Sequence, residues 1–312
     1  MEQRQDLFRY VVEEFHEDYT GGEIPRREFL RRMLLLGGGI VGANVLIDSL
    51  GLNAVSAAEW QQVIDTPATL EQAQTAPQVA ETDPAIKAEA ISFEARGFAQ
   101  LGYLVKPTGV TSAPGIIVIH ENRGLQPHIQ DIARRLAKAG YVALAVDLTS
   151  KSGGTAKFAD TAQISALLAQ TSGDEHVANL LEYAKFLKAQ TGVQATRIGA
   201  IGFCFGGGLT WRLSTAMSDL RAGAPFYGPA PDLAAVPNIK AAMLGIYGGL
   251  DARINAGVPA LEEALKKAGT KYAIKIYDGA NHAFNNDTGA NYKKDAADDA
   301  WKLTLEWFKN NL

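Results

Sequence analysis

Hydrophobic and polar positions follow a regular pattern from about residue 91 to the end of the chain. An extended segment at 97–107 comes first. Short apolar runs that suit buried strands follow it at 115–120, 141–146, 197–202, 222–227, 242–247 and 271–277. Helical periodicity occurs between them at 128–139, 174–190, 257–268 and 295–310, with a loop near 149–160 and a further helix after the Gly-rich turn beyond residue 202. Strands that alternate with helices form a parallel sheet covered on both faces. The pattern therefore predicts a doubly wound α/β fold with a mostly parallel sheet over residues 91–312.

The first 58 residues do not follow this pattern of alternating strands and helices. Residues 1–25 are polar and carry charges of both signs, and residues 25–32 read PRREFLRR. The uncharged run that follows, residues 33–47, is short for a membrane span, which needs about 20 apolar residues. AVSAA at 54–58 suits a small-residue cleavage site. We interpret residues 1–58 as a twin-arginine leader that engages the export machinery and directs the mature protein to the periplasm or the medium.

The alternative for this segment is an amphipathic helix that stays attached in a cytoplasmic protein and packs on the domain or a partner. Residues 59–90 are rich in Gln, Ala, Thr and Pro without clear periodicity, which favours a linker or a peripheral wrap. Gly37, Gly39 and Gly42 match the spacing of a dinucleotide fingerprint, but no strand precedes them, so we interpret the match as accidental.

Composition narrows the class of protein. The chain is 47% hydrophobic and 21% charged, as expected for a globular protein with a sizeable core. Its formal net charge of −4 argues against nucleic acid as a partner, because phosphate neutralisation requires clustered Lys and Arg. Cys204 is the one cysteine, so the chain has neither an internal disulfide nor a zinc–cysteine site. We expect no cofactor and no metal.

The residues with the strongest chemical signal are Gly202-Phe203-Cys204-Phe205-Gly206. They follow an apolar strand and open a helix, with the spacing of a nucleophile elbow in which cysteine replaces serine. A tight strand-to-helix turn strains the nucleophile's backbone, and glycines two residues to either side give it room. The helix N-terminus favours a thiolate. The alternative is a structural glycine turn with a buried cysteine.

Asp251 and His282 extend this signal. Each stands on a loop directly after a predicted strand, in YGGLDAR and YDGANHAF respectively. Alone, either residue would more often be structural. The order nucleophile, acid, histidine, each after its own strand, is that of the α/β-hydrolase fold, and it makes Cys204, Asp251 and His282 a candidate catalytic triad.

Residues 120–124 (HENRG) end the strand that precedes the first core helix. In this fold that loop supplies the second donor of the oxyanion hole, so we expect the backbone N–H groups of Asn122 and Phe205 to hold the oxyanion. His120 and Glu121 could be read as a metal pair, but no second histidine stands at a ligand spacing. We interpret the histidines His16, His128 and His176 as surface or structural residues.

The motifs together resemble the dienelactone hydrolase family of α/β-hydrolases over roughly residues 90–312. The resemblance rests on HENRGLQPHIQDIARRLAKAGYVALAVD, GFCFGGG, APFYG, GLDARIN and YDGANHAFNND, and RREFL resembles the leader of one subgroup. It implies a triad of Cys204, Asp251 and His282. It also implies that the carboxylate of Glu121 lies beside the resting thiol and helps to generate the thiolate.

The chain also departs from this family pattern. The family binds the substrate carboxylate with two arginines, yet no arginine occurs here between Arg135 and Arg197, and Asn286 stands at the second position. Arg123 and Arg253 are candidate substitutes. We therefore expect a cysteine hydrolase of a small ester, lactone or thioester. The rival hypotheses are a thiol redox protein that uses Cys204 and a non-catalytic binding protein that retains the fold.

Overall fold

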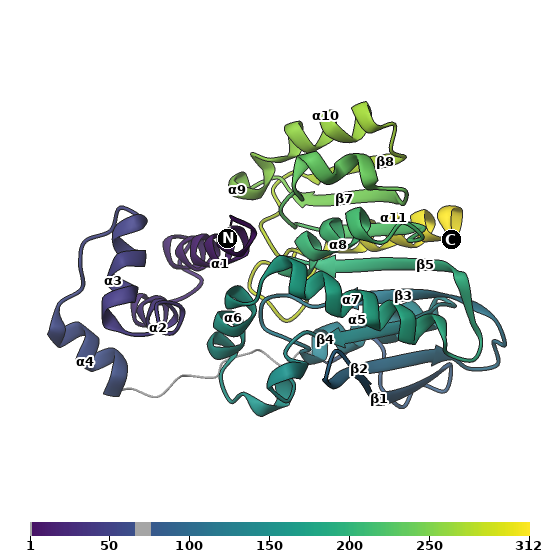
Figure 1. Ribbon diagram of the computed structural model, residues 1–312, viewed down its shortest axis with the longest axis horizontal. Helices are drawn as coiled ribbons and strands as arrows, with labels where there is room; N and C mark the ends of the chain where they lie inside the picture. Colours follow the sequence, from purple (N-terminus) through teal and green to yellow (C-terminus); the bar gives the residue numbers. More distant parts are fainter. Residues whose placement is uncertain (1, 66–75) are drawn as a thin grey trace. The chain divides into compact units, whose positions relative to one another are not determined.

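The computed structural model describes residues 2–65 and 76–312, whose elements Figure 1 labels. These residues separate into two compact units. The smaller unit contains the described residues up to 65 together with 156–175. The larger contains the described residues from 76 to 155 together with 176–312. The chain thus leaves the larger unit after residue 155 and returns to it at residue 176.

The larger unit is built on one eight-stranded sheet with the order β1-β2-β4-β3-β5-β6-β7-β8. β1 and β2 form an antiparallel hairpin, β2 also pairs antiparallel with β4, and every other neighbouring pair is parallel. The strands are β1 (Ile86–Ala95), β2 (Phe98–Pro107), β3 (Ala113–Ile119), β4 (Val142–Asp147), β5 (Val193–Phe203), β6 (Ala222–Phe226), β7 (Ala242–Gly248) and β8 (Tyr272–Tyr277). The central strands β3, β4, β6 and β7 are buried along almost their whole length, as expected for parallel strands covered on both faces.

Helices connect the parallel strands and cover the sheet. They are α5 (Pro127–Lys138), α7 (Gly173–Lys188), α8 (Phe205–Ala216), α9 (Ala252–Asn255), α10 (Val258–Ala268) and α11 (Lys294–Asn311), with short 3₁₀ turns at Ser150–Ser152, Thr155–Lys157 and Leu233–Asn238. Side chains alternate between the faces of a strand. On β5, Gly202 lies against α8, whereas Gly199 lies against Leu312 at the end of α11. Helices therefore cover both faces, which confirms the predicted doubly wound fold.

The structure differs from the sequence-based expectation at the start of this unit. Residues 59–90, expected as a linker or a peripheral wrap, include most of the helix Ala57–Asp65 and the first half of β1, while residues 66–75 lie outside the described residues. β1 is an edge strand in which only Ile86 is buried. A strand with so few buried apolar positions carries a weak hydrophobic pattern, which explains why the sequence favoured a linker.

The smaller unit is helical. It contains α1 (Glu2–Thr20), α2 (Arg26–Leu36), α3 (Ile40–Ser49), α4 (Ala57–Asp65) and α6 (Thr161–Gln170). α6 packs against α1 and α2, although more than 120 residues of sequence separate them. Gly37 and Gly42 touch at the α2–α3 turn, where a Cβ on Gly37 would lie 2.3 Å from the nitrogen of Ala43. This glycine cluster is a tight helix–helix turn without a preceding strand, so the dinucleotide match is accidental.

The arginines of the expected leader take part in ion pairs within this helical unit. Arg31 pairs with Glu28 at 2.8 Å and with Asp160, the N-cap of α6. Arg32 is buried, pairs with Asp18 at 3.0 Å and lies over a phenylalanine ring. Among the described helices, none alone is long and apolar enough to cross a membrane, and α2 and α3 reach that length only as a pair bent by 113°.

Candidate active site

Cys204 stands at the sharp turn between β5 and α8. Its backbone φ of 55° lies in the left-handed region, which is unusual for a residue with a side chain. The N–H of Cys204 donates to the carbonyl of Phe226 at 3.0 Å, so β6 holds the strained turn. A Cβ on Gly202 would lie 2.1 Å from the carbonyl of Gly206, and a Cβ on Gly206 would lie 2.4 Å from that of Ile119. The turn therefore requires both glycines of the predicted elbow.

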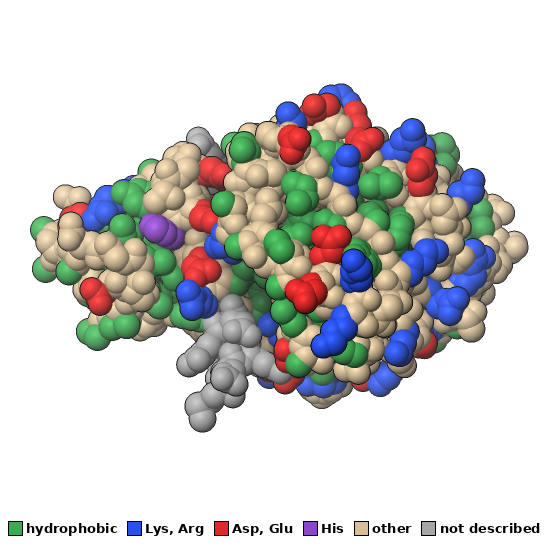
Figure 2. Space-filling model, turned by 90° about the horizontal axis from the view of Figure 1, so that it is seen from above, with side chains coloured by type: hydrophobic (Ala, Val, Ile, Leu, Met, Phe, Trp, Pro, Cys, Tyr) green, Lys and Arg blue, Asp and Glu red, His purple; other side chains and the backbone are tan. Residues whose placement is uncertain are grey.

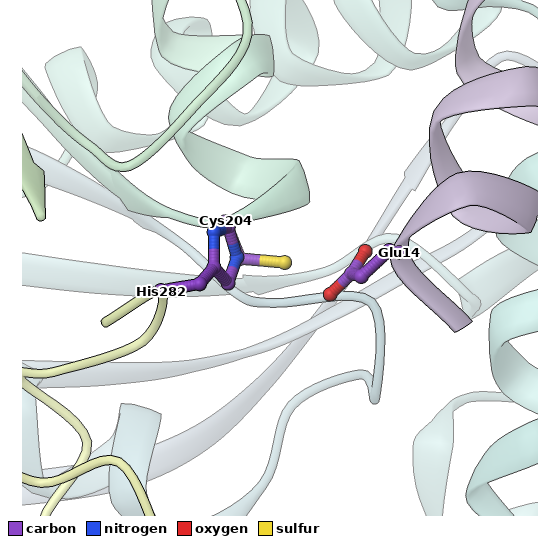
Figure 3. A group of neighbouring side chains, drawn as sticks. All are labelled: Glu14, Cys204 and His282. Carbon is purple, nitrogen blue, oxygen red and sulfur yellow. The ribbon is translucent and has the colours of Figure 1, made fainter. Parts of the chain in front are cut away.

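His282 and Asp251 reach the same edge of the sheet from the loops after β8 and β7. Nδ1 of His282 lies 2.6 Å from Oδ2 of Asp251, whose other oxygen accepts the N–H of Ile254 at 3.2 Å. Figure 3 shows the His282 ring beside the Cys204 side chain, and a ring nitrogen lies within 4.8 Å of Sγ. Because Nδ1 faces the carboxylate, Nε2 is the nitrogen available to the thiol. The structure thus brings the three residues of the predicted triad together.

The electrostatic environment favours a protonated His282. Burial lowers the pKa of this imidazole, but the negative charge of Asp251 and the hydrogen bond to it act in the opposite direction. A hydrogen bond with Cys204 and the charge of its thiolate raise the pKa further, to well above the usual value. A thiolate–imidazolium pair is therefore the state that this arrangement stabilises.

The loop after β3 passes close to the start of α8. His120 is fully buried, and its Nε2 accepts the N–H of Leu148 at 3.1 Å while Nδ1 contacts the carbonyl of Glu121 at 2.6 Å. A backbone N–H only donates, so Nδ1 carries the proton, and burial lowers the pKa of this histidine. Both nitrogens have backbone partners. His120 braces the loop, and it is not available as a metal ligand.

The two expected oxyanion donors are on adjoining segments. Phe205 is the first residue of α8, where a helix leaves the N–H groups without intrahelical partners. Asn122 is buried in the loop whose preceding residues, Ile119 and His120, contact Gly206 through their carbonyl oxygens. The loop after β3 therefore lies next to the first turn of α8, which begins directly after Cys204.

Glu121 and Asn286, which are 165 residues apart in sequence, meet in a buried hydrogen bond. Nδ2 of Asn286 donates to Oε2 of Glu121 at 2.9 Å, whereas Oε1 of Glu121 is buried with no hydrogen-bond partner among the described residues. Asn286, which stands where the family pattern has its second substrate-binding arginine and is therefore a candidate substrate contact together with Arg123 and Arg253, has its amide nitrogen engaged with Glu121. Arg123, on the loop after β3, and Arg253, on α9, are both partly buried.

Tyr227 is a site residue that the sequence analysis missed. It follows β6 with a positive φ of 37°, and its ring lies 5.0 Å from that of His282. Its hydroxyl is buried with no hydrogen-bond partner among the described residues. Burial, together with the charges of Glu121 and Cys204, raises the pKa of this phenol well above its usual value. The position of Tyr227 directly after a core strand, within the motif APFYG, was the available signal.

His128 and His176 are both buried but contact different groups. His128 on α5 is buried, and its Nδ1 lies 2.9 Å from Asp287, which also pairs with Arg135 at 2.6 Å. His176 on α7 is buried, with its ring 5.3 Å from that of Phe205.

In the face that Figure 2 shows, Lys and Arg side chains are most numerous toward the right and lower right of the view, and Asp and Glu side chains lie mainly toward the centre and the top.

Comparison with known proteins places this chain in a family. The family model described as the dienelactone hydrolase family matches residues 101–312. The chain belongs to the dienelactone hydrolase family. A Salmonella typhimurium relative provisionally named carboxymethylenebutenolidase is 33% identical over 238 residues, which cover 72% of this chain and 88% of that protein. A Saccharolobus solfataricus relative with the same provisional name is 34% identical over 230 residues, or 62% of this chain and 88% of that one.

A solved structure supports the same conclusion. The crystal structure of a protein provisionally named dienelactone hydrolase, from Klebsiella pneumoniae, is 31% identical. It aligns with a TM-score of 0.67 over 72% of this chain and 99% of that one. This dienelactone hydrolase family member is thus a hydrolase with the family fold, as the sequence predicted. Its N-terminal helices, α1 to α4, lie outside the matched residues.

Proposed function

We propose that this chain hydrolyses small ester, lactone or thioester substrates with Cys204 as nucleophile, His282 as proton carrier and Asp251 as the group that orients His282. One observation carries the proposal. The Asp251–His282 hydrogen bond of 2.6 Å leads to a ring nitrogen within reach of the thiol at a strained strand-to-helix turn. The name carboxymethylenebutenolidase, given to the relatives, describes hydrolysis of a lactone and agrees with this class of substrate.

The first half of the reaction follows from these positions. His282 takes the proton of Cys204, and the thiolate attacks the substrate carbonyl carbon, whose π electrons move to its oxygen. Backbone N–H groups of Phe205 and Asn122 stabilise the resulting oxyanion. Removal of one such donor typically costs about 2.7–4 kcal/mol of transition-state stabilisation. The oxyanion collapses, the C–O bond of the ester breaks, and His282 gives its proton to the departing alkoxide.

The second half regenerates the enzyme. The acyl group is now bonded to Sγ of Cys204 as a thioester, and neutral His282 removes a proton from water. The hydroxide adds to the same carbonyl, and collapse expels the Cys204 thiolate and releases the acid. Asp251 remains ionised throughout and stabilises the imidazolium in each half. Every step uses groups of this chain and water.

We further propose that the acyl pocket prefers neutral substrates. A buried substrate carboxylate requires a cation, because an unpaired buried charge is costly. The position where the family carries the second arginine holds Asn286, which donates a hydrogen bond to the carboxylate of Glu121. An anion near this pair would meet negative charge. Arg123 and Arg253 are the cations that could offset this repulsion.

A substrate panel tests the proposal. The full chain is assayed on p-nitrophenyl esters, lactones and thioesters beside Cys204→Ala, which removes only the sulfur and keeps the fold's glycines. We expect hydrolysis by the natural chain and none above background by Cys204→Ala. Equal rates for both proteins would reject Cys204 as nucleophile and favour a non-catalytic binding protein. Peroxide consumption that depends on Cys204, without ester hydrolysis, would favour the redox alternative.

A further inference from the structure

The amide of Asn286 has only one orientation that satisfies its neighbours. Its Oδ1 accepts two hydrogen bonds from Thr288, one from the backbone N–H at 3.0 Å and one from the hydroxyl at 2.7 Å. A backbone N–H cannot accept, so the oxygen of the amide must face Thr288 and the nitrogen must face Glu121. The donor to Glu121 is therefore assigned by the hydrogen-bond network itself.

The loop that carries this amide is braced on both sides. The N–H of Asn286 donates to the carbonyl of Ala283 at 2.9 Å, and the N–H of Gly289 donates to the carbonyl of Asn286 at 3.0 Å. The adjacent Asp287 is held by His128 and by Arg135 on α5. Although burial alone would raise the pKa of Asp287, these partners hold it well below its usual range. The loop therefore presents the amide nitrogen at a defined point beside Glu121.

We propose that Asn286 is a positioning residue that orients the Glu121 carboxylate toward the nucleophile, with Thr288 setting the direction of its amide. This inference rests on the proposed function and adds to it a second route to the Cys204 thiolate, through the carboxylate of Glu121. An amide holds the carboxylate through one hydrogen bond without neutralising its charge. The second oxygen, Oε1, has no hydrogen-bond partner among the described residues and is the one that can accept the thiol proton when His282 already carries a proton.

A single substitution separates this role from a merely structural one. Asn286→Asp keeps the shape and the acceptor for Thr288 but turns a carboxylate toward Glu121. Two adjacent buried carboxylates cannot both ionise readily, so the pair retains a shared proton to higher pH. A smaller fraction of Glu121 is then free to accept the thiol proton at neutral pH. The rate of Cys204 alkylation should fall about tenfold on its acid limb, which corresponds to a shift of about one pH unit toward higher pH.

Alkylation by iodoacetamide measures this directly, because Cys204 is the only cysteine in the chain. The rate constant is determined against pH for the full-length natural protein, for Asn286→Asp and for the control Asn291→Asp. The control adds the same charge outside the site and keeps the oxygen that accepts a hydrogen bond from Asn281. We expect the control to follow the natural protein. Thermal unfolding of each variant checks that the fold is retained.

Two further variants keep the test decisive if Asn286→Asp folds poorly. Thr288→Val removes one of the two donors to the amide oxygen and should slow alkylation about twofold in the same pH range, because only the backbone N–H of residue 288 then holds that oxygen away from Glu121. In a Glu121→Gln background, Asn286→Asp should cause no pH shift, since no second carboxylate is present. Profiles of Asn286→Asp and Thr288→Val that match the natural protein would overturn the inference. Failure of the proposed function appears separately, as ester hydrolysis that survives in Cys204→Ala.

Discussion

Nδ1 of His282 lies 2.6 Å from Oδ2 of Asp251, and the side chain of Asp251 is almost completely buried. The pairing fixes which imidazole nitrogen faces Cys204. It also raises the pKa of His282, because the buried carboxylate stabilises the protonated ring more than burial destabilises it. The chemistry of the thiol and the stability of this part of the fold therefore depend on the same hydrogen bond.

Asp251→Asn should move the alkaline limb of the kcat/KM profile to lower pH. In the natural protein, His282 keeps its proton above the ordinary histidine pKa of about 6.5 and can protonate the leaving group there. Without the carboxylate that support is lost, and kcat/KM should fall by about 100-fold or more. A pH–rate profile measures both effects. An unshifted limb would show that Asp251 does not control His282.

The raised pKa of His282 also predicts how the free energy of unfolding changes with pH. The pKa of His282 is higher in the folded than in the unfolded state, so its pairing stabilises the fold fully below about pH 6.5. That contribution is lost as the pH rises through the raised value. Denaturant unfolding at several pH values should therefore show a smaller pH-dependent decline in Asp251→Asn than in the natural protein.

Cys204→Ser should retain the fold and lose most of the activity. Serine accepts the same backbone conformation, but its much higher pKa requires stronger base assistance than a site with a stabilised thiolate supplies. Kinetics on the best substrate of the panel, with circular dichroism as the check on folding, measure the effect. Comparable kcat/KM values for the two proteins would remove thiolate chemistry from the mechanism.

Gly206→Ala should destabilise the protein by about 1–3 kcal/mol, because a new methyl group has no space between α8 and the carbonyls of Ile119 and His120. Gly257→Ala is the matched control. It has a negative φ, and its nearest neighbour beyond the adjacent residues lies 3.7 Å from the new Cβ. Urea unfolding should separate the two variants. An equally small change in both would mean that the elbow adapts to the methyl group.

The substrate preference is tested with a carboxylate-bearing ester and its methyl ester. We expect a higher kcat/KM for the neutral compound, because Glu121 and Asn286 stand where a cation would be needed. The assay is run at two salt concentrations. A preference for the carboxylate that weakens with salt and disappears in Arg123→Ala or Arg253→Ala would contradict the neutral-pocket proposal.

Two hypotheses for the N-terminal segment can be separated by experiment: a cleaved export signal and helices that stay attached to the chain. If residues 26–57 act as a twin-arginine signal, Arg26→Lys with Arg27→Lys should leave an uncleaved precursor in the cytoplasm. Fractionation and intact mass distinguish the outcomes, and an unchanged distribution with an intact N-terminus would favour the retained helices.

Asp160→Asn should lower the free energy of unfolding of the helical unit by about 1–2 kcal/mol. The substitution keeps the N-cap of α6 but weakens the ion pair with Arg31. Denaturant unfolding of the full chain measures the change.

The sequence was sufficient to predict that three residues lie close together, but not the contacts around them. Cys204, Asp251 and His282 follow parallel strands, and the carboxyl ends of such strands meet at one edge of the sheet, so order alone implied their proximity. The family comparison confirms the predicted fold and enzyme class. The hydrogen bond between Glu121 and Asn286 could not be predicted, because it depends on how two loops 165 residues apart approach each other.

Two elements escaped prediction for local reasons. β1 is an edge strand that joins β2 through a turn at Arg96 and Gly97, both with positive φ, and Arg-Gly lacks the usual Asn-Gly or Asp-Gly signal of a hairpin. α6 spans only ten residues and has apolar side chains without a strong one-sided stripe. Its partners are helices at the other end of the sequence, which periodicity within a window cannot reveal.

The crowded turn at Cys204 has a consequence for how such a site can change over evolutionary time. The side chain at position 204 can be exchanged for another small nucleophile without moving the backbone, whereas Gly202 and Gly206 leave no volume for even one added carbon. Variation in this lineage should therefore be more common in the surrounding pocket than at this turn. It should be nearly absent in the two glycines, so the shape of the turn should persist longer than the reaction it serves.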